Sequence, residues 1–455
     1  SMHSLMLPIF LTSITTSAAF LSLLFAPIEV MAGYGYTIAI GIMWAWILST
    51  TLLPSLIMLT NWKMDSKAIS HPGLLERMVD KIGKKILKAP RLVLTAGLIV
   101  VLIGAYGLSA LNVEVNIKTF FDEEHAIPQS LSFLDDEMVG SMDYTFRIEG
   151  DLKDPKTLKK MVRLQEYMEQ HPKISISISI ADIIKQMHRT IMDDDPVFET
   201  IPDERDKVNN LFTMYSMSGD PDDFSSLVNY DYTVGLVTVM SKNMSTQAAE
   251  TYVGEVNKFI KREINGEMEI TTTGMLPVLG DMVDMVVSSS FRSIFASIIM
   301  VSLIAGFFFR RFGWGVLAVI PLSSAVILNF GFMGLFNIDL NHVTAVLSSV
   351  IIGVGVDFAI HYISQYRRSV KTVKDPNILG REVIDEVGYP IVLDALSNMA
   401  FAALLFSQFL PVRHMGGLMV FAMLSTSVGT LTLLASVMEL LRRNKKIYNR
   451  LIRGN

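Results

Sequence analysis

Eight long apolar runs constrain this 455-residue chain more than any other feature of its sequence. A helix that spans a bilayer needs about 20 apolar residues, and each run is long enough. The runs lie near residues 5–27, 34–60, 92–112, 289–309, 313–336, 343–364, 388–410 and 416–441. Hydrophobic residues make up 51% of the chain and charged residues only 18%, which is too apolar for an ordinary soluble domain. The sequence therefore predicts a polytopic α-helical membrane protein.

Lysine and arginine gather after every second run, whereas the loops at 28–33 and 337–342 carry neither residue. The positive-inside rule places such basic loops in the cytoplasm. We therefore expect a multi-pass protein of the inner or plasma membrane with both ends of this chain cytoplasmic. The basic residues are Lys63, Lys67, Arg77, Lys81, Lys84, Lys85, Lys88, Arg91, Arg310, Arg311, Arg367, Arg368, Lys371, Lys374, Arg381, Arg442, Arg443, Lys445, Lys446, Arg450 and Arg453.

The same pattern divides the chain into six segments. They are two membrane helices in 1–60, a basic linker at 61–91, one membrane helix at 92–112, an outer domain at 113–288, five membrane helices in 289–441 and a basic tail at 442–455. Apolar residues of the linker recur at helical spacing, at Leu75, Met78, Val79, Ile82 and Ile86. This predicts an amphipathic helix that lies on an anionic membrane surface. A solvated connector helix fits the pattern equally well.

Segment 113–288 has the composition of a folded extracytoplasmic domain. Strands are predicted at 144–149, 173–180, 232–240 and 268–273, with helices at 155–170 and 246–261 and an irregular or helical insertion at 181–228. The order βαβ, insertion, βαβ is that of a ferredoxin-like α+β domain. The acidic turn at 193–196 is either a solvated loop or a calcium site. It lacks the Gly and distal Glu of a calcium loop, which favours the solvated loop.

Asp357 stands in the middle of the sixth run, within the stretch GVGVDFAIH. A charged side chain in a bilayer is costly and usually marks a path for ions, protons or substrate. Low dielectric favours the neutral carboxyl, so Asp357 can act as a proton relay; the alternative is a structural Asp held by a hydroxyl or a helix end. Gly353 and Gly355, one turn earlier, leave room for a neighbouring helix. His361, one turn later, either extends the proton path or lies at the interface without a role.

A second polar group lies on the seventh run. Asp394, Ser397 and Asn398 share one helix face, which predicts a polar stripe that could face Asp357. Asp394 follows Pro390 by about one turn, so we expect it near the cytoplasmic end of its span and as a candidate relay residue. Interhelical hydrogen bonding is the alternative role for this stripe.

An internal repeat relates the two ends of the chain. Pro8 matches Pro390 and Thr12 matches Asp394, both at an offset of 382 residues, within LPIFLTSITTSAAFLSLLFAPI and YPIVLDALSNMAFAALLFSQFL. The first two spans thus repeat the last two. The hydroxyls at Thr12, Thr15 and Thr16 are expected to make interhelical hydrogen bonds. The offset predicts about 290 residues of an earlier repeat upstream, so we expect a truncated transporter, with a split gene as the alternative.

With this architecture the sequence resembles the resistance–nodulation–division (RND) superfamily, in its MMPL-type, patched-like branch. The stretches that carry the resemblance are GVGVDFAIHYISQYRR, TTTGMLPVLGDMVDMVVSSSFRSIF and the paired helices above. The resemblance implies two six-helix repeats with porter-type domains, of which this chain holds helices five to twelve. It also implies proton-coupled transport, with Asp357 at the family's acidic position. The family often has Tyr after that Asp; Phe358 stands here, so we expect no hydroxyl that could share the proton.

The resemblance and the residues together predict a proton-coupled exporter of hydrophobic or amphipathic, lipid-like molecules. The alternatives are a lipid- or sterol-sensing receptor that does not transport, and a protein-export motor subunit. The sequence has no Walker-type loop, no hydrolase constellation and no cysteine, so we expect no enzyme, cofactor, metal or nucleic-acid partner. The expected partners are a lipid-like small molecule, protons, membrane lipids and the missing N-terminal repeat. The oligomeric state stays open.

Overall fold

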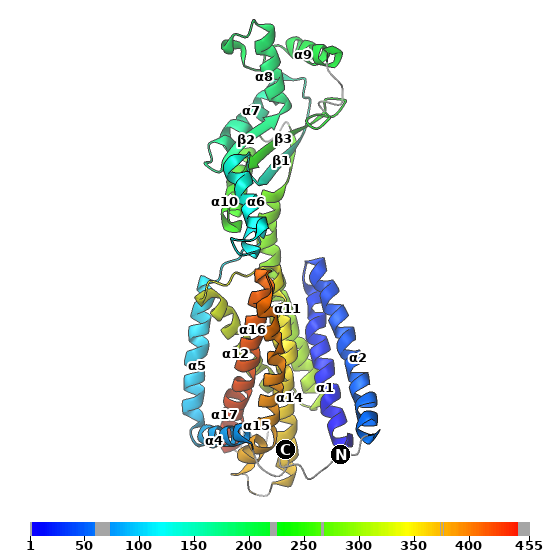
Figure 1. Cartoon of the computed structure of the whole chain (residues 1–455), viewed down its shortest axis with the longest axis vertical. Helices are drawn as coiled ribbons and strands as arrows, with labels where there is room; N and C mark the ends of the chain where they lie inside the picture. The colour runs from blue at the N-terminus through cyan, green and yellow to red at the C-terminus, as the bar shows by residue number, and fades with distance from the viewer. Residues whose placement is uncertain are drawn as a thin grey trace. The chain divides into compact units, whose positions relative to one another are not determined.

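The computed structural model describes residues 2–59, 73–218, 225–264, 268–373, 375 and 377–444. The basic residues Lys63, Lys67 and Lys374, and the tail beyond Asn444, lie outside these described residues. The chain divides into two compact units, drawn in Figure 1. We call Ser1–Val113 with Met285–Asn455 the helical unit, and Glu114–Asp284 the α/β unit.

Within the described residues, eight helical segments are long and apolar enough to cross a membrane. They are α1 (Met2–Leu21) with η1 (Ser22–Phe25), α2 (Glu29–Leu59), α5 (Pro90–Gly107) with η2 (Leu108–Ala110), α11 (Met275–Phe308), α12 (Phe312–Leu335), α13 (His342–Ala345) with α14 (Leu347–Thr372), α15 (Leu379–Asn398) with η7 (Met399–Phe406), and α16 (Leu410–Gly429) with η8 (Thr430–Leu434) and α17 (Ala435–Arg443). They follow the order of the predicted runs and confirm the polytopic helical fold class. The helix α11 begins at Met275, well before the predicted residue 289.

The helix α14 forms the centre of the helical unit. It packs against α1, α12, α15 and α16 (Figure 1). In the 18-residue apolar stretch that defines its span, 83% is buried inside the protein. The corresponding share is 11% for the span that begins at Pro90. Asp357 therefore lies on the most enclosed helix of the unit, among neighbours that can hold its side chain in place.

Two helices of this unit cross with their backbones in direct contact. Gly104 and Gly107 of α5 face Gly331 and Gly334 of α12, and a Cβ built on Gly334 would lie 2.0 Å from the Gly107 carbonyl oxygen. Small residues allow such close packing between membrane helices, where burial of apolar area supplies little drive for association. This crossing was not among the features predicted from the sequence.

The predicted amphipathic helix is α4 (Leu74–Lys88). It packs against α15, and Figure 1 shows it lying across one end of the helical unit. Its Ile86 is buried, whereas Met78 and Ile82 are exposed. We call this the basic end, because it carries the lysines of α4 and also Arg367, Arg368, Lys371, Arg442 and Arg443 at the ends of α14 and α17.

The α/β unit is built on one antiparallel sheet of four strands in the order β2-β3-β1-β4. Its elements are η3 (Ile117–Phe120), α6 (Ala126–Glu137), β1 (Met142–Glu149), α7 (Pro155–Glu169), β2 (Ile174–Ser179), α8 (Ile180–Ile191), η4 (Pro196–Phe198), α9 (Arg205–Ser218), β3 (Val234–Ser241), α10 (Thr246–Phe259), η6 (Ile260–Ile264) and β4 (Glu269–Thr273). Strand order and element order are those of the predicted ferredoxin-like fold. The buried side chains of β1, β3, α7 and α10 form its core.

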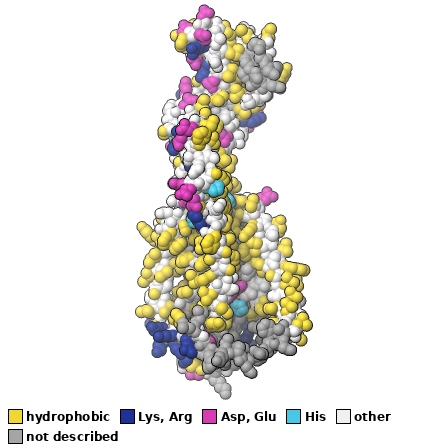
Figure 2. Space-filling model, in the orientation of Figure 1, with side chains coloured by type: hydrophobic (Ala, Val, Ile, Leu, Met, Phe, Trp, Pro, Cys, Tyr) yellow, Lys and Arg dark blue, Asp and Glu magenta, His cyan; other side chains and the backbone are white. Residues whose placement is uncertain are grey.

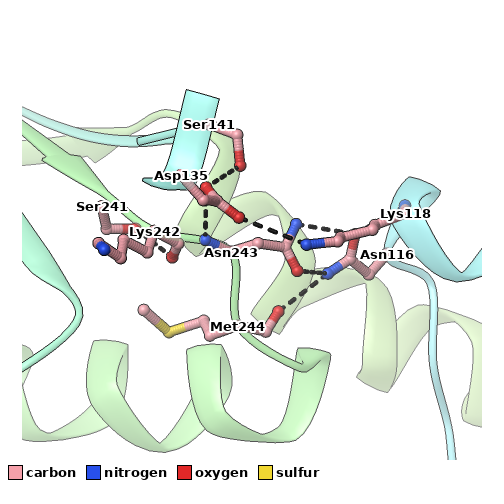
Figure 3. A network of polar contacts seen from close by, with 8 residues as sticks. All are labelled: Asn116, Lys118, Asp135, Ser141, Ser241, Lys242, Asn243 and Met244. Carbon is pink, nitrogen blue, oxygen red and sulfur yellow. Dashed lines mark hydrogen bonds and ion pairs between the residues drawn. The ribbon is translucent and has the colours of Figure 1, made fainter. Parts of the chain in front are cut away.

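Hydrogen bonds fasten the start of the α/β unit to the end of β3 (Figure 3). The Asn116 amide donates to Asn243 Oδ1 over 2.8 Å. The Asp135 carboxylate accepts from the backbone N–H of Asn243 at 3.0 Å and from the Ser141 hydroxyl at 2.7 Å. Lys118 completes the network as the ion-pair partner of Asp135, at 3.5 Å. A buried carboxylate held by three donors fixes these segments relative to one another.

The acidic turn forms a helix cap. Asp193 and Asp194 have positive φ angles of 59° and 60°, a conformation that Asp tolerates better than most residues. The Asp195 carboxylate then accepts from the backbone N–H of Val197 at 3.0 Å, at the start of η4. The turn thus uses its third carboxylate to satisfy a backbone donor at a helix N-terminus.

Candidate functional site

Asp357 stands at the midpoint of the candidate span His342–Thr372. Its neighbours Val356 and Phe358 are buried, while Asp357 itself is partly exposed. The Thr16 hydroxyl of α1 lies 3.2 Å from Asp357 Oδ1 and 2.9 Å from the carbonyl oxygen of Gly353. The hydroxyl has a single hydrogen to donate to these acceptors, and its contact with Asp357 links the candidate relay carboxyl to the neighbouring helix.

The position of Thr16 corrects an expectation drawn from the sequence. Phe358 replaces the tyrosine that often follows the family's Asp, so we expected no hydroxyl at this carboxyl. The hydroxyl instead comes from a different helix. Thr16 also contacts the Thr12 carbonyl oxygen of its own helix, at 2.8 Å. The hydroxyls of Thr12 and Thr15 donate to backbone carbonyls of their own helix, at 2.9 and 2.8 Å, and not across helices as expected.

Two glycines bring neighbouring helices close to Asp357. A Cβ on Gly353 would lie 3.3 Å from Ala19 Cβ of α1. A Cβ on Gly355 would lie 2.6 Å from Thr426 Cγ2 of α16 and 3.0 Å from Leu322 Cδ2 of α12. Both glycines therefore face a helix that packs on α14, and a larger residue at 355 would push α14 away from α16.

The polar stripe of α15 begins near the middle of its helical segment. That segment runs from Leu379 to Phe406, and Asp394 lies close to its midpoint. Asp394 and Ser397 are exposed, and Asn398 is partly exposed. The Asn398 amide donates to Asp394 Oδ1 at 3.2 Å. The charge of Asp394 acts on both Asp357 and His361, which places these three side chains in one region of the unit.

A further polar contact joins α14 to α15 nearer the basic end. The Gln365 amide donates to the Glu386 carboxylate and also lies 3.2 Å from the Ser369 hydroxyl. Asp357, His361, Gln365 and Ser369 recur at every fourth residue, so they share one face of α14. The spacing of four residues is visible in the sequence and is the signal by which Gln365 could have been predicted.

We call the α14–α15 polar seam the set Asp357, His361, Gln365, Ser369, Glu386 and Asp394. It leads from the middle of the span towards the basic end. Figure 2 shows acidic and histidine side chains within the otherwise apolar flank of the helices, and basic side chains gathered at the end. Polar groups at membrane depth are retained where they pair with one another or line a water-filled path, so the seam is suited to proton movement.

Towards the N-terminus of α14 from Asp357, away from the polar seam, three hydroxyls from three helical segments meet. Ser22 of η1 hydrogen-bonds with Ser297 of α11, and it lies 3.3 Å from the hydroxyl of Ser349 on α14. All three side chains are fully buried. The cluster holds the break between α1 and η1 against the central helix, and polar groups of this kind bind membrane helices together.

With the geometry established, comparison with known proteins identifies the chain. The sequence model of the MMPL family matches residues 2–93 and 151–452. The chain belongs to the MMPL family. A membrane protein from Methanocaldococcus jannaschii is 23% identical to this MMPL chain over 386 residues, which cover 82% of the chain and 96% of that relative.

Solved structures resemble this MMPL chain over nearly its whole length. The hedgehog release protein Disp of the water bear Hypsibius dujardini matches with a TM-score of 0.66 at 12% identity, over 97% of this chain and 59% of Disp. A heavy metal efflux pump matches at 0.57 with 11% identity, over 96% and 58%. SecDF in its super-membrane-facing form matches at 0.52 with 14% identity, over 98% and 49%.

These matches confirm the resemblance to RND-type proteins and show a shared fold. The chain spans about half to three-fifths of the length of the solved structures it matches. Its family is MMPL, and its fold is that of a polytopic membrane protein.

Proposed function

We propose that this MMPL chain is part of a proton-coupled secondary transporter that exports hydrophobic or amphipathic, lipid-like molecules and has no enzymatic activity. The observation that carries the proposal is Asp357, a carboxyl at the middle of the central helix with the Thr16 hydroxyl as its partner. A carboxyl at this depth can hold a proton taken up on one side and release it on the other. The α14–α15 polar seam supplies further groups through which the proton can pass.

The lipid-like substrate class is supported by the resemblance to the MMPL-type branch. Two other functions remain as alternatives. In a lipid- or sterol-sensing receptor, bound lipid would stay in place whatever the proton gradient. In a protein-export motor, which the fold similarity to SecDF favours as the second candidate, a translocating polypeptide would cross-link to the α/β unit. Retained lipid and a cross-linked polypeptide both differ from gradient-dependent lipid movement. One set of reconstituted samples can therefore distinguish a receptor, an export motor and a transporter.

The partner of the membrane helices is proposed to be a second repeat of the same architecture. Thr16 of α1 contacts Asp357 of α14. At the repeat offset of 382 residues, Thr16 corresponds to Asn398 of α15. By the symmetry of the repeat, Asn398 and Asp394 would face the equivalent acidic helix of the other repeat. The exposure of Asp394 at membrane depth supports this proposal, because an uncovered carboxylate facing lipid is costly.

We further propose an inner or plasma membrane location with the basic end in the cytoplasm. Anionic lipids of the cytoplasmic leaflet attract lysine and arginine near the surface, which supports this orientation. A cysteine introduced at Lys85 of α4 would then react with a membrane-impermeant maleimide only after the cells are opened. Labelling in intact cells would reverse the orientation.

The relay is tested by replacing Asp357 with Asn, which keeps the size of the side chain and removes its titration. The protein, with whatever partner repeat it requires, is reconstituted into liposomes under an imposed pH gradient, and movement of a fluorescent short-chain phospholipid between leaflets is followed. We expect Asp357→Asn to abolish the gradient-dependent rate. Asp203→Asn, which alters an exposed carboxylate of the α/β unit, should retain it. Gradient-dependent transport by Asp357→Asn at the wild-type rate would refute the proposal.

A further inference from the structure

The helices α4 and α15 run antiparallel, and at every fourth position a glycine of one helix meets a large apolar side chain of the other. A Cβ on Gly83 would lie 2.6 Å from Ile384, one on Gly388 would lie 2.6 Å from Val79, and Leu87 faces Gly380. Such contacts hold the two helices at a fixed separation. The side chains on the flank of this contact therefore have rigid supports on both sides.

A pocket of about 260 Å³ lies on that flank. It is lined by Glu76, Arg77, Val79 and Asp80 of α4 and by Arg381, Ile384, Asp385 and Tyr389 of α15. This volume is just below the range of pockets that hold drug-sized ligands. The walls combine carboxylates and arginines over an apolar floor, so the pocket suits a small group that carries charges of both signs.

The carboxylates of this pocket are not fully satisfied by the protein. Asp80 Oδ2 pairs with the Lys84 ammonium, whereas the buried Asp80 Oδ1 has no hydrogen-bond partner. The hydrogen bond from Lys84 holds the pKa of Asp80 below its usual range, so Asp80 is ionised at neutral pH. Asp80 and Asp385 lie within hydrogen-bonding reach of each other, and two carboxyl groups in such contact either share a proton or are joined by a cation.

Two cations of the protein already act on this pair. The charges of Lys84 and Arg381 reach both carboxylates, and Arg381 lies 3.5 Å from Asp385 along its own helix. Neither cation hydrogen-bonds to Asp80 Oδ1, which stays open to a further donor. The described residues contain no group of three His, Cys, Asp or Glu side chains placed to hold a metal ion. An ammonium with several N–H donors is the cation that matches a pair of carboxylates with one free buried oxygen.

The pocket also offers a place for an anion. The Arg77 guanidinium is exposed and forms no ion pair with any residue that the structure describes. Arg77 and Asp80 are three residues apart, so their side chains are neighbours on one helix face. Arginine binds phosphate oxygens well because its donors form a planar fork. The pocket thus presents a phosphate-binding group beside an ammonium-binding pair.

The surroundings of this pocket have the composition of a membrane interface, where lipid headgroups lie. It is at the basic end of the helical unit, and the adjacent Met78 and Ile82 of α4 are 53% and 52% exposed. Apolar side chains beside lysines are typical of a helix at the membrane interface. We propose that the α4–α15 pocket binds a phospholipid whose headgroup joins a phosphate to a primary ammonium, with the ammonium between Asp80 and Asp385 and the phosphate on Arg77.

The lipid itself supplies the sharpest test, because successive methylation removes the N–H donors of the ammonium and leaves its charge. Purified protein is incubated with equimolar phosphatidylethanolamine, its N-methyl and N,N-dimethyl forms, phosphatidylcholine and phosphatidylglycerol, and the retained lipids are counted by native mass spectrometry. We expect phosphatidylethanolamine to be retained about fivefold over phosphatidylcholine, the ratio that one net hydrogen bond gives. Retention should fall with each methyl group.

Variants locate the site. Asp80→Asn and Asp385→Asn should bring the phosphatidylethanolamine to phosphatidylcholine ratio close to one, whereas Arg77→Gln should lower retention of both lipids. Glu382→Gln, an exposed acid of α15 outside the pocket, should keep the wild-type ratio. Free phosphoethanolamine at the lipid concentration should not displace the bound lipid, because it lacks the chains that lie beside Met78 and Ile82.

Four results would overturn the proposal. One is equal retention of phosphatidylethanolamine and phosphatidylcholine by the wild-type protein, which needs no variant to interpret. Another is preferential retention of phosphatidylglycerol, which would show an anionic-lipid surface. The third is an unchanged lipid ratio in a folded Asp385→Asn protein. Displacement by free phosphoethanolamine would assign the pocket to a soluble ligand and would also overturn the lipid assignment.

Discussion

The crossing of α5 and α12 gives a prediction whose size follows from the structure. In Gly331→Ala the new Cβ would lie 2.1 Å from the carbonyl oxygen of Gly104 and 2.6 Å from its Cα. Ordinary contact begins near 3.4 Å, so the methyl group is about 1.3 Å too close. The obstructing atoms belong to the backbone and cannot swing aside as a flexible side chain does. The two helices must therefore separate.

Two terms of opposite sign set the free-energy change. Overpacking a well-packed contact costs about 1–3 kcal/mol, while alanine is favoured over glycine inside a helix by about 1 kcal/mol. Because backbone atoms obstruct the methyl group, the overpacking cost lies in the upper part of its range, about 2–3 kcal/mol. The net loss of stability is then about 1–2 kcal/mol, which corresponds to a fall of about 2–8 °C in the apparent Tm. Gly107→Ala obstructs the same crossing, with its Cβ 2.3 Å from the Gly331 carbonyl oxygen. The double variant should lose less than the sum, because both changes separate the same helices.

The measurement is thermal unfolding of the detergent-solubilised protein, followed by size-exclusion chromatography after heating. Gly41→Ala is the matched control, because Gly41 is also in a membrane helix and a Cβ there meets no atom within 4 Å. We expect the Tm of this control to be unchanged or slightly raised. An unchanged Tm for Gly331→Ala, or an equal fall in the control, would show that the backbone contact does not limit packing at this crossing.

Two other predictions follow from polar contacts. Thr16→Val keeps the side-chain shape and removes the hydroxyl at Asp357, so it should slow gradient-dependent transport. Thr16→Ser retains a hydroxyl and should keep the wild-type transport rate. Equal rates in the two variants would show that the Thr16 hydroxyl has no part in the relay. In the α/β unit, the hydrogen bond from Lys159 holds the pKa of Asp203 below its usual range. This contribution is present above the ordinary Asp value of about 3.9 and is lost as the pH falls through the lower folded value. Lys159→Ala should thus lower the Tm slightly at pH 7 but not at pH 2, and an equal fall at both would contradict this reasoning.

Much of the fold was predictable because it depends on local patterns. The Asp154–Pro155 start of α7 was visible as a cap, and Asp154 accepts from the backbone N–H of Lys156 at 3.0 Å. The strands alternate in burial as their sequences do. The start of α11 was not found, because Asp281 and Asp284 lower the hydropathy of its first turns. In the structure, Gly274 with φ of +110° ends β4, and the helix begins at the next residue.

The candidate site also contains one residue that the sequence predicted, Asp357, and one that it did not, Thr16. Asp357 could be identified because a carboxyl in a long apolar run is rare whatever surrounds it. Thr16 could not, because a helical threonine usually bonds to the carbonyl one turn before it. Thr15 and Thr16 both make such a bond, and only Thr16 also reaches Asp357, 341 residues away. The local sequence does not distinguish these two threonines. The packing of α1 on α14 distinguishes them, because it brings only Thr16 to Asp357.

The missed contact between Gln365 and Glu386 has a more general cause. The sequence analysis began the seventh span at residue 388, because apolar runs were used to define spans, and Glu386 was thereby left outside. In the structure the helix begins at Leu379, and Glu386 accepts a hydrogen bond from Gln365 of the central helix. An apolar-run criterion finds the parts of a helix that face lipid and excludes turns that carry polar contacts. Since polar pairs within a bilayer mark proton and substrate paths, the residues just outside an apolar run are where further members of such a path are to be sought.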